Sequence, residues 1–277
     1  MKRALLAIFV LPICLSLQSC AENEVTEPAD LPEKITSDSI EYVKSVTFDV
    51  GVTHKLEFTY NNDHTLQKVI SGSSNLPWKY TSIFNYDNGK LKESVFESQS
   101  PTTYSYDQNR INRKSLFSNN IETTRYLYTY NSEGRISERK VLIASEGALS
   151  IRSLCTYTYG LDDELIETKT DVFDESGLKT GTIVRKIEGL SKELNINPFS
   201  LLHPLYQHQA TELFDDVVLM NTNKLPLKIS ETGNVEVGPV TYEYTYDVSG
   251  KRIDKVKLKI KIGDSNPYYT AGAVFHY

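Results

Sequence analysis

One short motif recurs along this chain, and it constrains the fold more than any other feature. Each copy has an aromatic residue and a tyrosine two positions apart, then a polar turn, then a single Ile or Leu. Side chains two positions apart share one face of a β-strand, and Asn, Asp, Gly and Ser supply turn geometry. Each copy therefore predicts a β-hairpin. The copies are FTYNNDHTL (58–66), FNYDNGKL (84–91), YSYDQNRI (104–111), YTYNSEGRI (128–136), YTYGLDDEL (157–165) and YTYDVSGKRI (244–253).

The Ile or Leu after each turn begins the return strand, and we expect it to pack beside the second tyrosine across the hairpin. The segment VFDESGLK (172–179) is a degenerate copy, and the sequence ends in another aromatic-x-Tyr, VFHY. In KRIDKVKLKIKI (251–262) lysines alternate with apolar residues, which predicts one wet face and one buried face. The spacing between copies varies, so the repeat is irregular.

Successive hairpins joined by short loops predict an all-β fold, an antiparallel meander. Using every repeat requires about 12–14 strands, and a twisted sheet of that size curls or closes. We therefore expect a strongly curved sheet or an open barrel. One short helical insert, near 188–225, breaks the strand pattern, and Thr211 is placed to cap a helix containing Leu213 and Phe214. We expect this insert to cover an apolar opening of the sheet.

Residues 1–19 have the pattern of an export signal. Lys2 and Arg3 precede an apolar stretch that is too short for a comfortable membrane span. The stretch ends in LQSC (17–20), which resembles a bacterial lipobox. The resemblance implies that Cys20 is lipidated and that the mature chain is attached to a membrane without spanning it. The alternative is an ordinary secretory signal with a chance cysteine.

The remaining chain is expected to comprise a flexible tether (20–39) and a single β-meander domain (40–277). The tether is acidic and poor in large apolar residues. It resembles the surface-export signals of Bacteroidota lipoproteins, which implies the outer membrane and the cell surface rather than a periplasm-facing position. The formal net charge of −6 disfavours a nucleic-acid partner. Cys155 is left without a cysteine partner in the mature chain, so we expect a buried, inert thiol.

The sequence resembles a family of Bacteroidota lipoproteins that is classed as a domain of unknown function and described as having a porin-like fold. The features that carry the resemblance are the lipobox, the tyrosine repeats, an NPF segment (197–199) and NKLPLKI (223–229) before the last hairpin. The resemblance implies a curved or barrel-like meander over about residues 40–277 and transfers no catalytic residue.

The sequence offers little sign of catalysis. His203 and His208 lie near Asp215 and Asp216, but HExxH motifs and cysteine pairs are lacking, so we expect no metal site. No nucleotide-binding or nucleophile motif occurs, and we expect no cofactor. A pair of carboxylates brought together by the fold, as in a glycosidase, stays open as an alternative.

The candidate ligand-binding residues are aromatic. The chain has 18 tyrosines and 10 phenylalanines, and a tyrosine hydroxyl needs a polar partner or water. Several rows of tyrosine facing one concave surface can therefore bind a ligand, and Trp78 can stack on a sugar ring or close the core. The candidate residues are Trp78, Tyr80, Tyr128, Tyr157, Tyr206 and Tyr244.

The function expected from these features is that of a non-enzymatic, surface-anchored lipoprotein that binds a glycan or another extracellular ligand. Its expected partners are a membrane, through the N-terminal lipid, and a carbohydrate or an envelope protein. The first alternative is a structural partner in an outer-membrane complex. Less favoured alternatives are a glycan hydrolase and a membrane barrel, because the terminal AGAVFHY resembles the insertion signal of outer-membrane barrels.

Overall fold

The computed structural model describes residues 42–49, 53–73, 79–97, 99–145, 147–161, 164–191, 224–233, 238–250, 252–263 and 269–277. Sixteen strands lie within these ranges. In chain order they are β1 (Ser45–Asp49), β2 (Thr53–Tyr60), β3 (Leu66–Ser73), β4 (Lys79–Asp87), β5 (Lys90–Phe96), β6 (Thr102–Asp107), β7 (Arg110–Ser118), β8 (Ile121–Tyr130), β9 (Ile136–Ser145), β10 (Ala148–Tyr159), β11 (Leu165–Phe173), β12 (Lys179–Leu190), β13 (Pro226–Thr232), β14 (Val240–Ser249), β15 (Arg252–Ile262) and β16 (Tyr269–His276).

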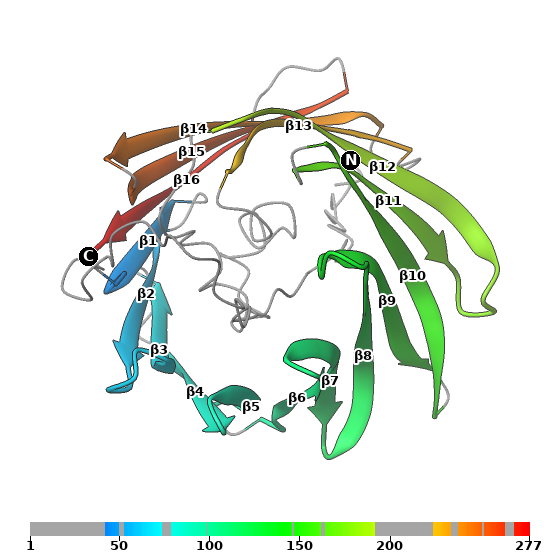
Figure 1. The fold of residues 1–277 in the computed structure, drawn as a ribbon, viewed down its shortest axis with the longest axis horizontal. Helices are drawn as coiled ribbons and strands as arrows, with labels where there is room; N and C mark the ends of the chain where they lie inside the picture. The colour runs from blue at the N-terminus through cyan, green and yellow to red at the C-terminus, as the bar shows by residue number, and fades with distance from the viewer. Residues whose placement is uncertain are drawn as a thin grey trace, which may run out of the picture.

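The strands form a closed antiparallel barrel in which each strand pairs with its neighbours in sequence (Figure 1). The first strand closes the ring by pairing with the last, from Ser45 opposite His276 to Asp49 opposite Gly272. The predicted all-β meander is thus confirmed, and it has more strands than expected and is closed rather than open. Closure satisfies the hydrogen-bonding groups that an open sheet would leave at its two edges.

The inward face of the barrel is the buried face. Along β15 the inward side chains Val256 and Leu258 are fully buried, while Lys257 and Lys259, which alternate with them, are exposed. The alternation predicted for this strand is therefore confirmed. The same pattern holds on other strands, and Cys155 is buried on the inward face of β10, as expected. One contiguous core links the inward side chains around the ring.

The two ends of the barrel differ in what they carry. We call one the repeat end, because the turns of all six repeats lie there, after β2, β4, β6, β8, β10 and β14. The chain also enters β1 and leaves β16 at this end, and the connection between β12 and β13 starts and finishes there. We call the opposite end the far end. It carries the other connections, such as the one from β3 to β4 and the one from β15 to β16.

The predicted cross-strand pair of tyrosine and Ile or Leu is confirmed in five hairpins. Tyr130, for example, lies opposite Ile136. A register shift precedes the tyrosine in each of these five hairpins. The last hairpin differs because β14 continues three residues past Tyr246, to Ser249, so Ile253 lies opposite Val248 and not opposite Tyr246.

The insert predicted near 188–225 lies largely outside the described residues. β12 continues as a regular strand through Leu190, so residues 188–190 belong to the sheet. Its end and the start of β13 are held together, because Ser191 N donates to the Leu225 carbonyl at 2.8 Å and Leu225 N donates to Ser191 Oγ at 2.9 Å. The helix expected around Thr211 lies outside the described residues. No helix in the described part of the chain has the length and apolar character that a membrane crossing requires.

Candidate functional site

The second tyrosine of each repeat joins two neighbouring hairpins at the repeat end. The Tyr130 hydroxyl on β8 donates to the Ile111 carbonyl at the start of β7, at 2.6 Å. Tyr86 has the equivalent backbone hydrogen bond with Leu66. We call these contacts the tyrosine latches. The others, with donor first, are Tyr60 to Val43 (2.7 Å), Tyr106 to Leu91 (2.9 Å), Tyr159 to Ile136 (2.9 Å), Tyr246 to Pro226 (2.8 Å) and Tyr277 to Ile253 (2.8 Å).

The basic residue of the motif completes the latch. Arg135 lies over the Tyr159 ring, with 4.5 Å between the guanidinium carbon and the ring centroid. The neighbouring Ile136 supplies the carbonyl that the same tyrosine binds. A cation over an aromatic face is attracted by the ring quadrupole. Lys90 over Tyr106, Arg110 over Tyr130 and Arg252 over Tyr277 repeat the arrangement.

The latches therefore explain most of the motif in structural terms. The basic residue of one repeat lies over the tyrosine ring of the next strand pair, and the Ile or Leu accepts a hydrogen bond from the hydroxyl of that tyrosine. Burial raises the pKa of Tyr130 and of Tyr159 to about 12. The irregular spacing of the repeats has no consequence for the latches, because extra residues lengthen the hairpins toward the far end. Within the described residues the junction between β11 and β12 lacks a latch, since β12 contains no tyrosine.

We expect Tyr130→Phe to lower the free energy of unfolding by about 1 kcal/mol, because the Ile111 carbonyl loses its donor. Denaturant unfolding of the mature chain at neutral pH measures this change. Tyr269→Phe is the matched control, since Tyr269 is 52% exposed on β16, and its change should stay within about 0.5 kcal/mol. Equal effects of the two substitutions would contradict the latch.

The raised pKa of the latch tyrosines also predicts sensitivity to alkali. The pKa of Tyr106 and of Tyr130 is about 12 in the folded chain, above the ordinary value of 10.0. The unfolded chain therefore loses these protons first, and stability falls as the pH rises from about 10 through about 12. Tyr130→Phe should show a smaller fall over this range than the unsubstituted chain.

The inward face is chemically divided. From β14 through β16 and on to β4 the buried inward residues are almost all apolar, as Leu56, Phe58 and Val256 illustrate. From β7 to β13 the inward face also carries charged groups. Lys114 is 2% exposed and lies over the rings of Tyr104 and Tyr126, at 6.0 and 5.6 Å. The remaining buried charged residues are Arg139, Arg185 and Glu231.

Arg185 and Glu231 form a buried ion pair between β12 and β13. Arg185 Nε donates to Glu231 Oε2 at 2.7 Å, and the two side chains are 10% and 2% exposed. The Tyr242 hydroxyl lies 3.5 Å from the same carboxylate oxygen. Among the described buried residues, Glu231 is the only acidic one. Its hydrogen bonds join its own strand, β13, to β12 and β14. This carboxylate therefore has a structural role, and a facing carboxylate of the kind a glycosidase uses is not among the described buried residues.

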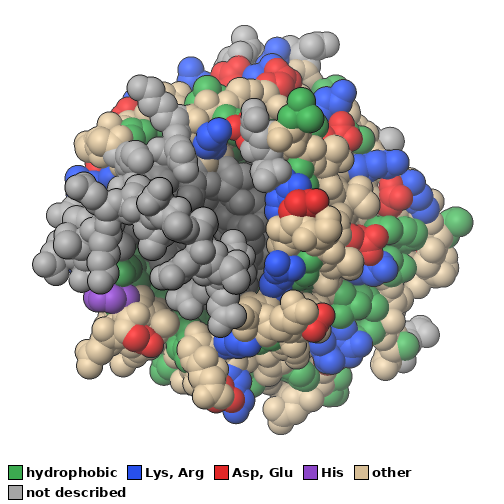
Figure 2. Space-filling view, in the orientation of Figure 1, with side chains coloured by type: hydrophobic (Ala, Val, Ile, Leu, Met, Phe, Trp, Pro, Cys, Tyr) green, Lys and Arg blue, Asp and Glu red, His purple; other side chains and the backbone are tan. Residues whose placement is uncertain are grey.

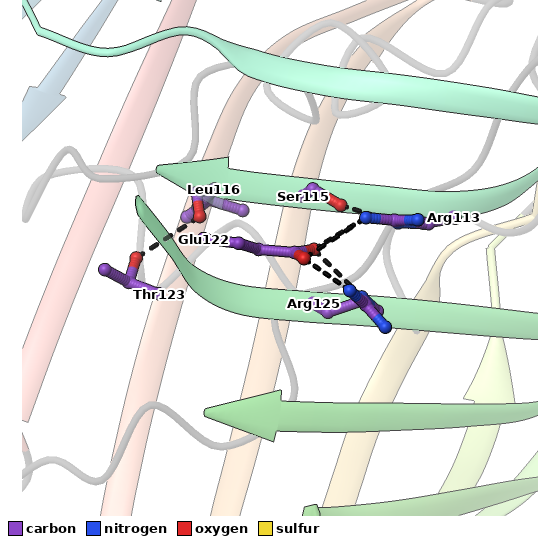
Figure 3. Close-up of polar contacts among 6 residues, drawn as sticks. All are labelled: Arg113, Ser115, Leu116, Glu122, Thr123 and Arg125. Carbon is purple, nitrogen blue, oxygen red and sulfur yellow. Dashed lines mark hydrogen bonds and ion pairs between the residues drawn. The ribbon is translucent and has the colours of Figure 1, made fainter. Parts of the chain in front are cut away.

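A second charged cluster lies on the outward face of the hairpin β7–β8 (Figure 3). The Glu122 carboxylate lies between two guanidinium groups. Arg113 Nη2 donates to its two oxygens at 3.0 and 3.2 Å, and Arg125 Nε donates at 2.9 Å. Arg113 Nε also donates to Ser115 Oγ at 2.8 Å. The hydrogen bonds from Arg125, above all, lower the pKa of Glu122 to about 2, so the cluster keeps its charges at ordinary pH. It holds the hairpin together close to its register shift.

The inner rim of the far end carries exposed aromatic residues. Tyr80, the second residue of β4, lies opposite the buried Ser71, so it shares the inward face with Phe84. Its side chain is 39% exposed, and its ring stacks on Phe96 with centroids 5.5 Å apart. Tyr269 begins β16 on the inward face and is 52% exposed. The rim therefore differs from the repeat end, where the tyrosine hydroxyls are engaged in latches.

The described ligand candidates lie at different places on the inward face. Tyr128 is buried on β8 opposite Arg139, and Tyr157 is buried on β10 two residues from Cys155, which lies opposite the same arginine. Tyr244 is buried on β14, with its ring stacked on Tyr246. Tyr80 lies at the far end. Trp78 and Tyr206 lie outside the described residues.

The predictions about metals and lipidation stay untested. His203, His208, Asp215 and Asp216 lie outside the described residues, as does Cys20. Within the described ranges, groups of three or more His, Cys, Asp or Glu placed to hold a metal ion are absent. The sequence reasoning missed the latches because it paired each tyrosine with its own hairpin. The signal was present, since a Lys or Arg precedes the Ile or Leu in four of the six copies.

The fold is similar to that of solved proteins from Bacteroides. A crystal structure described as a porin-like protein from Bacteroides uniformis matches with a TM-score of 0.57 and 13% sequence identity, over 84% of this chain and 96% of that chain. A porin-like protein from Bacteroides vulgatus gives a TM-score of 0.48 and 12% identity, over 85% and 98% of the two chains. No family model and no curated protein matches the sequence. The chain thus shares a porin-like barrel fold with the Bacteroides uniformis protein. Because the sequence identity is 13%, the similarity concerns the fold alone.

Proposed function

We propose that this chain is a lipid-anchored envelope protein that binds a glycan at the far end of its barrel. The observation that carries the proposal is the aromatic rim. The side chain of Tyr80 is 39% exposed and is held in place by stacking on Phe96. An exposed aromatic face fixed by a neighbouring ring is suited to stack on the apolar face of a sugar. Trp78, two residues before Tyr80 in the sequence, is the second residue that we propose for glycan binding.

The position of the rim suits an anchored protein. The chain enters the barrel at the repeat end, where residues 42–44 lead into β1. Attachment of a lipid to Cys20 would therefore tether the barrel by its repeat end and leave the far end without an attachment. A ligand outside the cell would meet the far end first, which is where Tyr80 and Tyr269 are exposed.

The outward face argues for an anchored barrel rather than a membrane-spanning one. A spanning barrel needs an outward band of apolar side chains. Here the outward positions include the exposed residues Lys169, Lys186, Glu243, Lys257 and Lys259. Figure 2 shows basic and acidic side chains interleaved over the surface on the right of the view. This face suits contact with water.

A glycan array probed with the mature chain tests the proposal. We expect binding to one class of glycan, and we expect Tyr80→Ala to weaken it by about tenfold through loss of stacking. Ile83→Ala is the matched control, because Ile83 is 47% exposed on the outward face of the same strand and should have no effect. Absence of glycan binding, or binding that Tyr80→Ala leaves unchanged, would contradict the proposal. Retention of an envelope protein without any glycan would favour the assembly role instead.

A further inference from the structure

The outward face of β15 carries a line of four lysines, which we call the lysine stripe. It consists of Lys255, Lys257, Lys259 and Lys261, with Lys257 and Lys259 the most exposed. Alternate residues of a strand lie about 7 Å apart, so the stripe is about 20 Å long. It lies on the wall of the barrel and not on its rim, so it is independent of the glycan site proposed above.

The four ammonium groups form no hydrogen bond or ion pair with any residue that the structure describes. Other outward lysines behave differently. Lys55, for example, binds Glu57 at 2.7 Å, and Lys228 binds Glu188 at 2.7 Å. On a chain of net charge −6, the stripe is therefore a line of positive charge that is not engaged in ion pairs with the described residues.

The strands on the two sides of the stripe differ. On β14, Glu243 lies opposite Lys259 and Asp247 lies opposite Lys255, so this side carries negative charge. On β16 the outward positions opposite the stripe are uncharged, with Gly272 beside Lys257 and Thr270 beside Lys259. A narrow strip along β16 is thus free of acidic side chains and open to an anion that the lysines can reach from one side, and its other side carries the exposed Asp49 of β1, opposite Gly272.

We propose that the lysine stripe and the adjoining face of β16 bind a linear polyanion, namely a polysaccharide that carries sulfate or carboxylate groups. A line of cations suits a line of anions, and a flexible polymer can follow β16 while avoiding the acids of β14. A broad anionic surface such as a membrane would also face Glu243 and Asp247, which would repel it. Charges of both signs on neighbouring strands therefore favour the polymer over the lipid surface.

Binding of heparin to the mature chain, with uncharged dextran for comparison, tests the proposal. We expect heparin alone to bind, and we expect the double change Lys257→Gln and Lys259→Gln to weaken it by about tenfold. The matched control is Lys169→Gln with Lys186→Gln, which removes two exposed lysines from β11 and β12 and should change binding by less than about twofold. Salt should weaken the binding, because exposed charges are screened over about 8 Å at physiological ionic strength.

A second pair of variants keeps all four lysines. Thr270→Glu places a carboxylate beside Lys259 and should weaken heparin binding, while Thr270→Gln should not. The proposal is overturned if the control pair on β11 and β12 weakens binding as much as the stripe pair. It is also overturned if the chain binds only vesicles of phosphatidylglycerol and phosphatidylcholine and not heparin. The two sites are distinct if the change of Lys257 and Lys259 to Gln removes heparin binding while Tyr80→Ala still weakens binding to the glycan array.

Discussion

Replacing Glu231 with Ala should lower the free energy of unfolding by about 3 kcal/mol, one of the two largest effects expected for a single change in this chain. The substitution removes the carboxylate to which Arg185 Nε donates at 2.7 Å, and it leaves the cation 10% exposed inside the barrel. The effect should be large because the pair is buried and adds a side-chain contact between β12 and β13, across 46 positions in sequence. Denaturant unfolding of the mature chain measures it.

Two further variants separate the charge from the packing. Glu231→Gln keeps a hydrogen-bond acceptor and should cost less than Glu231→Ala. The double change Arg185→Met and Glu231→Met removes both charges, and it should recover most of the lost stability because apolar side chains replace the pair. A loss below about 0.5 kcal/mol for Glu231→Ala would show that the pair contributes little.

Gly233→Ala is the second change with a large expected effect. Gly233 follows β13 with a φ of +91°, and a Cβ atom there would lie 2.0 Å from the Thr182 carbonyl oxygen on β12. The backbone of one strand must move to relieve this contact, so we expect a loss of about 3 kcal/mol in the free energy of unfolding.

Gly177→Ala is the matched control for the glycine. Gly177 has a φ of +82°, and a Cβ atom there would meet nothing within 4 Å, so only the backbone conformation is penalised. We expect a loss of about 1 kcal/mol there. Similar losses at both glycines would mean that the close approach of Gly233 to Thr182 is unimportant.

Much of the fold follows from local sequence. Alternation along residues 251–262 and the polar turn after each tyrosine are enough to predict the hairpins and their buried faces. Closure did not follow, because it depends on β1 meeting β16 at a distance of more than 200 residues, and no local pattern encodes that meeting. The position of the polar and apolar halves of the interior also depends on this ring order.

The environment of each candidate tyrosine could not be predicted from the sequence, for a physical reason. A tyrosine on a strand can be buried, latched to a neighbouring hairpin or exposed at a rim. In all three environments the sequence shows the same alternation of inward and outward residues. Tyr128, Tyr130 and Tyr80 show the three outcomes. The distinction depends on distance from the barrel end, and in four latches a Lys or Arg precedes the residue that accepts the hydrogen bond. Only Tyr80, of the described candidates, has an aromatic face open to a ligand.

Mapping of tyrosine nitration by tetranitromethane, with and without a bound glycan, tests the central claim most directly. The claim is that the repeat tyrosines lock one end of the barrel and that the ligand binds at the other. In the folded chain Tyr80 and Tyr269 should be nitrated first, and the latch residues Tyr106, Tyr130 and Tyr159 should resist. Saturating glycan should protect Tyr80. Nitration of Tyr130 as fast as Tyr80, or no protection of Tyr80 by the glycan, would contradict the account.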